Sequence, residues 1–407
     1  MGAPASDLLA RFYTKADVGE LLIRLMPKRR PKSFIDLGAG EGSLSAAAVS
    51  RWNKTRYVTV DIDVSTSDLL CAKLNGAGGQ SHVHHVQDVL DPDLPDLILA
   101  GDNFDTSVTN PPYLKPEWRP GFEKILNRAG IADALASKSD VSADILFMAQ
   151  SIRLTKPGGT IGLILPDALV TGRHFQDLRS VLMRQHAIRS VVQLPRSSFK
   201  GTEAQAFILL LERGSAGAGK VALQRFDRHS GLSRPLFIDA NAAEHRLDYN
   251  FHSATMVSVD GATLKDVGVV VTRGRVNATE ARRAGMDIFH TSNFSEMVDG
   301  EISFPYDHAS KPTGGVIAEP GDILLARIDR KLEQKIGIVA GGSSVISDCV
   351  YRISVPAEAR RRVLEAMRSD VGRSLIAAAA RGVGARLIGK AELLSIPFQM
   401  CRTDNEY

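Results

Sequence analysis

The stretch Thr109-Asn110-Pro111-Pro112-Tyr113 closes a predicted strand and opens a loop. It follows the apolar-leaning run 103–108, so it predicts a strand tip. Two consecutive prolines have no N–H groups to give to a sheet and fix φ at about −65°, so they end the strand. They also hold Asn110 and Tyr113 in a set relation. An amide beside an aromatic ring at the carboxyl edge of a sheet suits a nucleobase, which offers an amino group and a ring.

A glycine-rich turn lies upstream of this stretch. The buried run 33–37 leads directly into Gly38-Ala39-Gly40 and then into an alanine-rich helix that ends near Trp52. A strand, a glycine turn and a helix in this order predict the start of a βαβ unit. The loop alone leaves two interpretations open, a nucleotide-type cofactor site and a purely structural turn.

Acidic residues at successive strand ends favour the cofactor interpretation. The strand 57–60 ends at Asp61, and the strand after it is followed by Asp88. An acid at the second strand end can accept both hydroxyls of a ribose, and Asp61 is favoured over Asp63 because it comes first. These residues do not decide between NAD and S-adenosylmethionine. Asp36, beneath the glycine turn, would suit a ligand with an ammonium group, which favours S-adenosylmethionine.

Composition indicates a two-domain protein without a membrane segment. The chain has 407 residues, of which 44% are hydrophobic and 24% charged, and a formal net charge of +4. No apolar run approaches the roughly 18 residues that span a bilayer, and Asp7 and Arg11 interrupt any secretory signal, so we expect a cytoplasmic protein. The three cysteines form no CxxC pair, which argues against a disulfide framework and a zinc site.

The order of predicted elements divides the chain into three parts. We expect an α/β domain over 1–213, a connector over 214–254 and an α+β domain over 255–407. Residues 114–140 predict a long loop with a helix that covers the site. The remaining predictions are helices at 143–154, 176–185, 358–367 and 371–379, and strands at 160–165, 188–194, 206–211, 267–272, 323–328, 336–339 and 350–355.

Two other patterns are set aside. The segment 214–220 nearly spells a phosphate-binding loop, but Val221 replaces the Ser or Thr that would hold magnesium, so a flexible hairpin is favoured. His82, His84 and His85 have no nearby cysteine or carboxylate pair, which indicates alternating strand residues rather than a metal site. We therefore expect no metal.

The α/β half resembles the adenine-N6 DNA methyltransferases of the γ arrangement. Residues 110–113 are similar to that family's catalytic motif, and 12–14 to its leading motif, with Lys15 where a proline is expected. The resemblance implies a Rossmann-like fold, S-adenosylmethionine as cofactor and a flipped adenine. The implied catalytic residues are Asn110, Pro111, Pro112 and Tyr113. The implied cofactor-binding residues are Thr14, Asp36, Gly38, Ala39, Gly40, Asp61 and Asp88. Tyr113 and Phe199 would stack on the flipped base.

The C-terminal half resembles a target-recognition domain from the specificity subunits of type I restriction-modification systems. The similarity lies in 246–249, in 319–327 and in a late helix ending at Gly382 with 388–397. One such unit is present rather than two. An unrelated α+β accessory domain is the alternative.

Together these features predict a site-specific adenine-N6 methyltransferase of double-stranded DNA. A restriction-modification or phage-defence setting is expected, with a separate nuclease or defence subunit as a partner. One alternative is a protein-glutamine methyltransferase, because that group also uses Asn-Pro-Pro-Tyr on an amide. The other is a catalytically silent DNA-binding module, against which the intact Asn110 and Asp36 argue.

Overall fold

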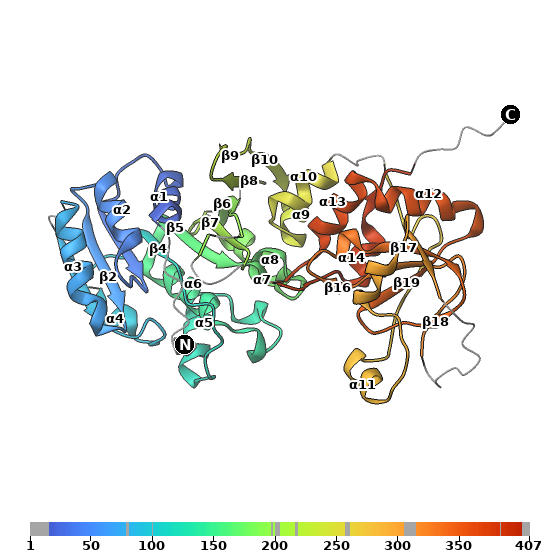
Figure 1. Ribbon diagram of the computed structural model, residues 1–407. Coiled ribbons are helices and arrows are strands. Elements are labelled where there is room, and N and C mark those ends of the chain that lie inside the picture. Colours follow the sequence, from blue (N-terminus) through green and yellow to red (C-terminus); the bar gives the residue numbers. More distant parts are fainter. Residues whose placement is uncertain are drawn as a thin grey trace. The chain divides into compact units, whose positions relative to one another are not determined.

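The structure is a computed structural model and describes residues 16–78, 81–99, 101–196, 198–199, 204–215, 219–256, 261–304, 315–382 and 384–400. The chain divides into two compact units, Met1–Tyr249 (the large unit) and Asn250–Tyr407 (the small unit) (Figure 1). Each unit has its own sheet and core. Within the described residues, no helix combines the length and the apolar character that crossing a membrane would require.

The large unit is built on one mixed sheet with the strand order β10-β8-β6-β7-β5-β4-β1-β2-β3, and β9 pairs with β8. The strands from β3 to β5 are parallel, and β7 runs antiparallel between β5 and β6. The strands are β1 Ser33–Leu37, β2 Arg56–Asp61, β3 His82–Val86, β4 Phe104–Thr109, β5 Thr155–Pro166, β6 Ala187–Gln193, β7 Ala206–Glu212, β8 Lys220–Asp227, β9 Gly231–Leu232 and β10 Leu236–Asp239.

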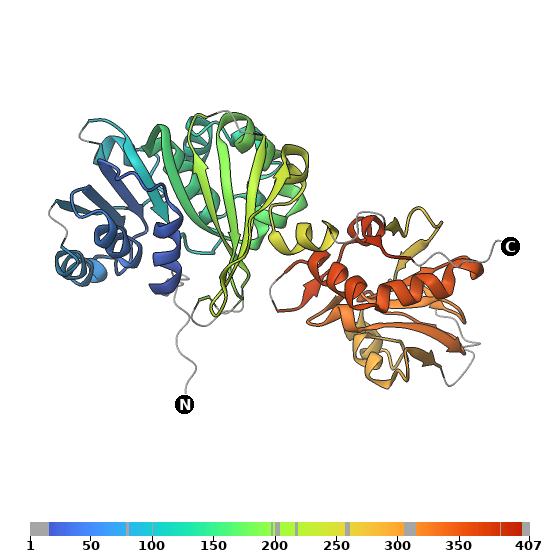
Figure 2. The same cartoon turned by 90° about the horizontal axis from the view of Figure 1, so that it is seen from above.

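Helices cover both faces of this sheet (Figure 2), which is why its central strands β1 and β4 are buried along almost their whole length. Neighbouring residues on one strand enter different layers: Phe34 packs with α1 to α3, whereas Ile35 packs on the face that α4 and α6 cover. The helices are α1 Ala16–Leu25, α2 Ser43–Arg51, α3 Ser67–Gly76, α4 Leu94–Ile98, α5 Pro120–Arg128, α6 Ala143–Leu154, α7 Asp167–Thr171, α8 Gln176–Gln185 and α9 Ala240–His245. Helix α10, Tyr249–Met256, begins at the last residue of the large unit and otherwise belongs to the small unit.

The fold class predicted from the sequence is confirmed, because a Rossmann-like methyltransferase sheet precedes a separate C-terminal sheet. The end of the large unit differs from the expected position. Strands β8 and β10, inside the expected connector, extend the large sheet, with β8 parallel to β6. Val221 and Leu223 alternate with less buried residues on β8 and pack in the core, so this segment belongs to the large unit, which ends at Tyr249.

The small unit contains a five-stranded sheet with the order β12-β19-β15-β17-β13 and three short strand pairs. Its strands are β11 Ala262–Thr263, β12 Val270–Arg273, β13 Glu301–Ser303, β14 Ile317–Ala318, β15 Ile323–Ala326, β16 Ile328–Asp329, β17 Ile336–Gly341, β18 Ser344–Val345, β19 Val350–Ser354, β20 Arg386–Leu387 and β21 Pro397–Phe398. Its helices are α11 Ala278–Arg283, α12 Ala357–Arg368, α13 Asp370–Ala379 and α14 Lys390–Ser395.

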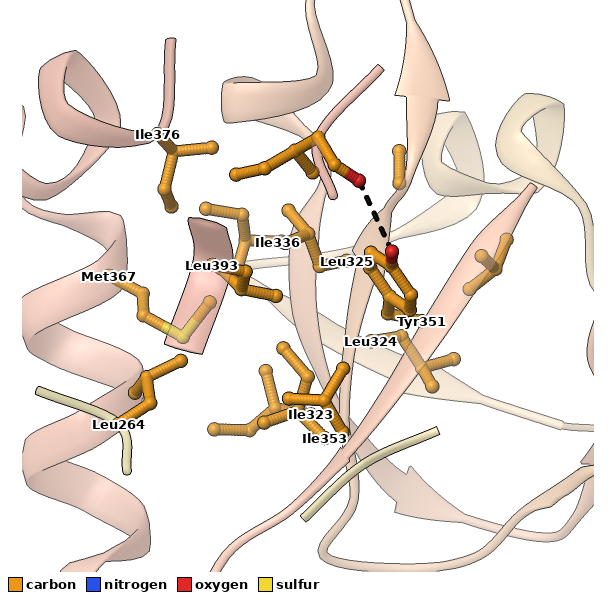
Figure 3. Packing of buried hydrophobic residues seen from close by; sticks show 14 of the residues in the cluster. Leu264, Ile323, Leu324, Leu325, Ile336, Tyr351, Ile353, Met367, Ile376 and Leu393 are labelled. Atoms are coloured by element: carbon orange, nitrogen blue, oxygen red, sulfur yellow. Dashed lines mark hydrogen bonds between the residues drawn. The ribbon is translucent and has the colours of Figure 1, made fainter. Parts of the chain in front are cut away.

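The core of the small unit lies between this sheet and the late helices. Ile323 and Ile353 from the sheet pack in one cluster with Met367 of α12 and Ile376 of α13 (Figure 3). Tyr351 is buried in the same cluster and donates its hydroxyl to the carbonyl of Ile388 at 3.2 Å. This hydrogen bond fastens the segment after β20 to the sheet.

Candidate active site

Four strand ends of the large unit meet at one cavity. Gly38 follows β1, Asp61 ends β2, Asp88 lies just after β3, and Asn110 follows β4. The strand order reverses between β1 and β4, which is where open α/β sheets form their ligand crevice. The cavity has a volume of about 360 Å³ and is lined by Gly38, Ala39, Gly40, Glu41, Ser43, Leu44, Asp61, Ile62, Asp88, Val89, Leu90, Asn110, Pro112, Leu114, Pro116, Glu117, Arg119, Ala143 and Phe147.

The glycine loop is held by hydrogen bonds from the neighbouring strand. The Gly38 amide donates to the carbonyl of Val60 at 2.8 Å, and the Gly40 amide donates to Oδ2 of Asp61 at 2.7 Å. Gly38 has φ +70°, a conformation that favours glycine, and a Cβ placed there would lie 2.9 Å from Cε1 of Phe147. The loop therefore lies against the Phe147 ring with its backbone open to the cavity.

Asp61 and Asp63 have different tasks in the structure. Asp61 lines the cavity, and its second oxygen accepts the Asp63 amide at 2.9 Å. Asp63 caps the following turn, since its carboxylate accepts the amide and hydroxyl of Ser65 at 2.9 and 2.6 Å. Of the two candidates for the ribose, the one facing the cavity is Asp61.

Asp88 lies at the mouth of the same cavity. One carboxylate oxygen accepts the Leu90 amide at 2.8 Å, which fixes the turn after β3. The other accepts from Nη1 of Arg119 at 3.2 Å, an ion pair between two solvent-accessible side chains. A group that bonds to this second oxygen must compete with Arg119.

Asp36 sits beneath the glycine loop and is fully buried, so it does not line the cavity itself. Its Oδ2 accepts the Ser45 hydroxyl at 2.7 Å, whereas Oδ1 has no hydrogen-bond partner among the described residues. Burial raises the pKa of Asp36 to about 7; the hydrogen bond from Ser45 opposes this rise, and the charge of Asp61 adds to it. A buried carboxylate with one unsatisfied oxygen is stabilised by a nearby positive charge.

The loop after β4 is fixed at both ends. The Thr109 hydroxyl donates to the carbonyl of Leu37 at 2.6 Å and joins the end of β4 to the end of β1. The Leu114 amide donates to the carbonyl of Pro112 at 3.0 Å, and the Leu114 carbonyl accepts the Ala143 amide at 3.0 Å. Asn110 and Pro112 line the cavity, whereas Pro111 is buried and does not.

Tyr113 and Phe199, the two predicted stacking residues, lie against each other. Their ring centroids are 6.1 Å apart in an edge-on arrangement, although 86 positions separate them in the chain. Burial, with a smaller contribution from the charge of Asp144, raises the pKa of the Tyr113 hydroxyl above its usual range, so it stays protonated. Phe199 is only 3% exposed and packs in the core beside β6 and β7, outside the cavity lining.

Sequence reasoning missed several residues of the cavity wall. Phe147 and Ala143 come from α6, whose mostly apolar sequence predicts a core helix rather than a ligand contact. Pro116, Glu117 and Arg119 belong to the loop that was expected to cover the site, but no pattern in that loop singles them out. Thr14, the predicted residue of the leading motif, lies outside the described residues.

The patterns set aside also have structural explanations. His82 and His84 both hydrogen-bond to the Thr59 hydroxyl, at 2.8 and 2.9 Å. No group of three or more His, Cys, Asp or Glu side chains that could hold a metal occurs within the described parts of the chain. Of the predicted hairpin, Gly214 and Lys220 are described and lie beside β7 and β8, while 216–218 lie outside the described residues.

The donor set of the cavity fits S-adenosylmethionine. The cavity wall carries four carboxylates, from Glu41, Asp61, Asp88 and Glu117, against one cation, Arg119. The buried Asp36 adds a fifth acidic group beneath the loop. A ligand with a sulfonium and an ammonium group is positively charged at two places, so the electrostatic field of this cavity favours it.

Comparison with known proteins identifies relatives of both units. The family described as N-6 DNA Methylase matches residues 5–242. The type II methyltransferase M.PstI of Providencia stuartii is 22% identical over 356 residues, which cover 78% of this chain and 68% of that protein. The release factor glutamine methyltransferase of Caulobacter vibrioides is 31% identical over 160 residues, which cover 37% of this chain and 51% of that enzyme.

One solved structure resembles nearly the whole chain in fold. The type IIG restriction endonuclease BpuSI matches 97% of this chain with a TM-score of 0.54 and 13% identity. The chain spans 59% of the length of BpuSI. At this identity the likeness concerns the fold alone.

Proposed function

The chain belongs to the N-6 DNA Methylase family, a family of adenine-specific DNA methyltransferases, and from this premise we propose that it methylates N6 of adenine at a specific site in duplex DNA. The observation that carries the proposal is the convergence of Gly38, Asp61, Asp88 and Asn110 on one cavity. S-adenosylmethionine, when bound there, supplies the methyl group on a positively charged sulfur. The backbone of Gly38, Ala39 and Gly40 would contact it. Asp61 would accept hydrogen bonds from its ribose hydroxyls, and Asp88 would accept one from its adenine amino group.

Asn110 and Pro111 prepare the target nitrogen in this proposal. The amino nitrogen of adenine is a poor nucleophile because its lone pair is delocalised into the ring. The side-chain oxygen of Asn110 and the carbonyl oxygen of Pro111 accept its two hydrogens, so the nitrogen becomes more pyramidal and its lone pair more available. The work is positioning and charge stabilisation, which a loop fastened at Thr109 and Leu114 is suited to perform.

Base flipping is the second part of the proposal. In a duplex the amino group of adenine is hydrogen-bonded to thymine and its ring is stacked between neighbours, so the base has to leave the stack before both amino hydrogens reach Asn110 and Pro111. The Tyr113 ring is the group beside Asn110 on which the base can stack. Phe199 supports that ring from its edge, at a centroid distance of 6.1 Å, and its buried ring would have to become exposed to stack on the base itself.

The small unit is proposed to recognise the target sequence, and the whole chain to act in a restriction-modification or phage-defence system with a separate nuclease partner. Support comes from the resemblance of residues 319–327 to a target-recognition domain and from the independent core of this unit. Residues 246–249, the other segment with this resemblance, belong to the large unit.

Expression of the full chain in a bacterial host without adenine methylation tests the function. Sequencing of the host DNA with detection of modified bases should show N6-methyladenine at one sequence motif. If that motif is palindromic, the adenine on the complementary strand should be methylated as well. A folded chain that binds S-adenosylmethionine but leaves all adenines unmodified would contradict the proposal. An Asn110→Ala chain in the same host is the control for background modification.

The similarity to a release factor glutamine methyltransferase supports a second candidate, methylation of a protein glutamine amide. The matched segment covers 37% of this chain and leaves the small unit without a role. Incubation with labelled S-adenosylmethionine and either duplex DNA or a glutamine-containing release-factor peptide separates the two candidates. Label in the peptide with none in the DNA would favour the second.

A further inference from the structure

One end of the small sheet gathers charged side chains from segments far apart in the sequence. Strands β12 and β15 end there, and β17 and β19 begin there, because β15 and β19 run antiparallel to their neighbours. We call this region the charged end. It comprises Arg273, Arg275, the loop 327–335, Asp348 and Arg386.

The carboxylates of the charged end are already neutralised. Asp329 pairs with Lys335 at 2.7 Å, Asp348 pairs with Arg273 at 3.2 Å, and Glu333 pairs with Arg386. Four cations remain that have no carboxylate within 4.0 Å among the described residues: Arg275, Arg327, Arg330 and Lys331. The surface consequently has a surplus of positive charge.

The loop 327–335 is rigidly held. Its short strand β16 pairs with β20, and the Lys331 amide donates to the Asp329 carboxylate at 2.9 Å. Arg386 donates through Nε and Nη2 to the carbonyl of Arg330, at 3.1 and 2.9 Å. The segment after β20 is fastened in turn by the Tyr351 hydroxyl on Ile388 (Figure 3). The backbone at Arg330 is therefore fixed.

The side chains at the tip of this loop are accessible to solvent. Arg330, Lys331 and Gln334 are exposed, while the Arg330 carbonyl is bonded to Arg386 and the Lys331 amide to Asp329. Arg and Lys pair with O6 and N7 of guanine or with phosphates, and Gln pairs with N6 and N7 of adenine. A cation surplus would also attract an acidic protein, but the exposed amide beside the two cations matches base edges and favours DNA.

We propose that the loop 327–335 is the sequence-reading element of the small unit and that Arg330, Lys331 and Gln334 determine the target specificity. This inference rests on the proposed function, because it assumes that the chain modifies DNA. Arg386 acts as a positioning residue, since its guanidinium holds the loop backbone and does not itself contact the bases. Because the loop backbone is already held, binding to duplex DNA would cost conformational entropy mainly in the three side chains and little in the backbone.

The test uses the full chain with Arg330→Ala, Lys331→Ala and Gln334→Ala, and with Arg361→Ala as the matched control. Arg361 is a strongly exposed arginine of the same unit, on α12, and has an exposed carboxylate partner in Glu365. For a residue that reads a base, kcat/KM on the target duplex should fall about 10- to 100-fold, and modified-base sequencing should show one relaxed position in the motif. The control should keep both the rate and the motif.

Salt dependence of duplex binding provides a second readout that does not need catalysis. Each phosphate contact removed should reduce the slope of log K against log salt by about 1. Arg386→Lys retains the charge but loses the two hydrogen bonds from the guanidinium to the Arg330 carbonyl. It should therefore lower sequence specificity, while S-adenosylmethionine affinity and the melting temperature stay near wild type.

The outcomes separate this inference from the proposed function. If the wild type methylates one motif and the Arg330→Ala, Lys331→Ala double variant methylates the same motif at the same rate and with the same salt slope, the loop is not the reader. If the wild type modifies no DNA, the proposed function fails; duplex binding that is weakened in the double variant and not in Arg361→Ala would then still identify the loop as a DNA surface.

Discussion

The carboxyl edge of the large sheet and the charged end of the small sheet both collect polar groups at strand ends, but they collect opposite charges. The cavity at the carboxyl edge presents Asp61 and Asp88 beside a single arginine. The charged end neutralises its own carboxylates and leaves Arg330 and Lys331 unpaired by any carboxylate in the described chain. A negative cavity attracts a cationic methyl donor and repels phosphates, so affinity for DNA has to arise elsewhere, and the charged end can supply it.

The largest effect is expected for Asn110→Ala at the carboxyl edge. Removing the hydrogen-bond acceptor of the target amino group should lower kcat by about 10²- to 10³-fold, the cost typical for a lost preorganised polar group in an active site. Affinity for S-adenosylmethionine should change little, because the glycine loop and Asp61 are untouched. Labelled methyl transfer and calorimetric cofactor binding measure the two quantities.

Asn103→Ala is the matched control for that variant. Asn103 precedes the other end of β4 and donates its amide to the carbonyl of Arg153 at 2.7 Å, so its loss should cost about 1 kcal/mol of unfolding free energy and no activity. Near wild-type methyl transfer by Asn110→Ala would remove Asn110 from the mechanism and leave the negative cavity as a binding site only.

Much of the carboxyl edge could be predicted from the sequence because strand, turn and helix follow one another locally there. The run 33–37, the glycine turn and the prolines at 111 and 112 each carry a local signal, and the parallel topology brings their ends together. Phe147 could not be predicted, because a ligand-facing aromatic in an apolar helix has the same pattern as a core residue. Strands β8 and β10 have a weak sequence signal, because a glycine-rich stretch precedes β8 and only Val221 and Leu223 of β8 are buried.

The charged end was even less accessible to sequence reasoning. Arg330 and Arg386 are 56 positions apart, and their contact depends on the pairing of β16 with β20, each only two residues long. The residues of 327–335 would have the same composition in an unstructured loop, so composition does not reveal that this loop is held. Which cations are left without a carboxylate depends on the local pair Asp329–Lys335 and on the long-range pair Glu333–Arg386, and the second pair is a property of the fold.

Phe199→Ala is expected to have the next largest effect. It tests whether the flipped base is held at the carboxyl edge of the large sheet rather than at the charged end. If the ring takes part in stacking, directly or by supporting Tyr113, KM for the target duplex should rise about 10- to 100-fold, as for a lost stacking partner. A 2-aminopurine at the target position should then show a weaker fluorescence increase on binding. Phe199→Leu, which keeps most of the volume, controls for packing. Equal KM values with a lowered melting temperature would assign Phe199 to the core alone.

Asp36→Asn tests the charge beneath the glycine loop. The pKa of Asp36 is raised from 3.8 to about 7 in the folded protein, so the ligand-free chain should lose stability as pH rises from about 4 to about 7. A cationic cofactor favours the ionised form of the Asp36 carboxyl. Its Kd should therefore decrease by up to about tenfold for each unit that the pH rises, up to about pH 7. The α-amino group of the cofactor stays charged below about pH 7.7, so measurements between pH 6 and 7.5 isolate Asp36.

The asparagine variant should bind the cofactor about tenfold more weakly at pH 7.5, without pH dependence, and be no less stable than the wild type in its ligand-free form. Asp105→Asn is the control at the opposite edge of the sheet, where Asp105 accepts the Ser33 amide at 3.0 Å, and it should leave cofactor affinity unchanged. A cofactor Kd that keeps its pH dependence in Asp36→Asn would show that the titration of a group other than Asp36 causes this dependence.

The smallest effect is expected when the glycine loop is altered without changing any charge. Gly38→Ala places a Cβ at φ +70° and 2.9 Å from Phe147, whereas Gly158→Ala, at φ +74° on β5, meets no atom within 4 Å. Both variants should lose about 1 kcal/mol of unfolding free energy through backbone strain. Only Gly38→Ala should displace Phe147 from the cavity wall, so its Kd for S-adenosylmethionine should weaken by a further few-fold while the affinity for duplex DNA stays the same. Equal cofactor affinity in the two variants would mean that the close packing of Gly38 on Phe147 serves the fold and not the ligand, and that the acidic groups alone distinguish this edge from the charged end.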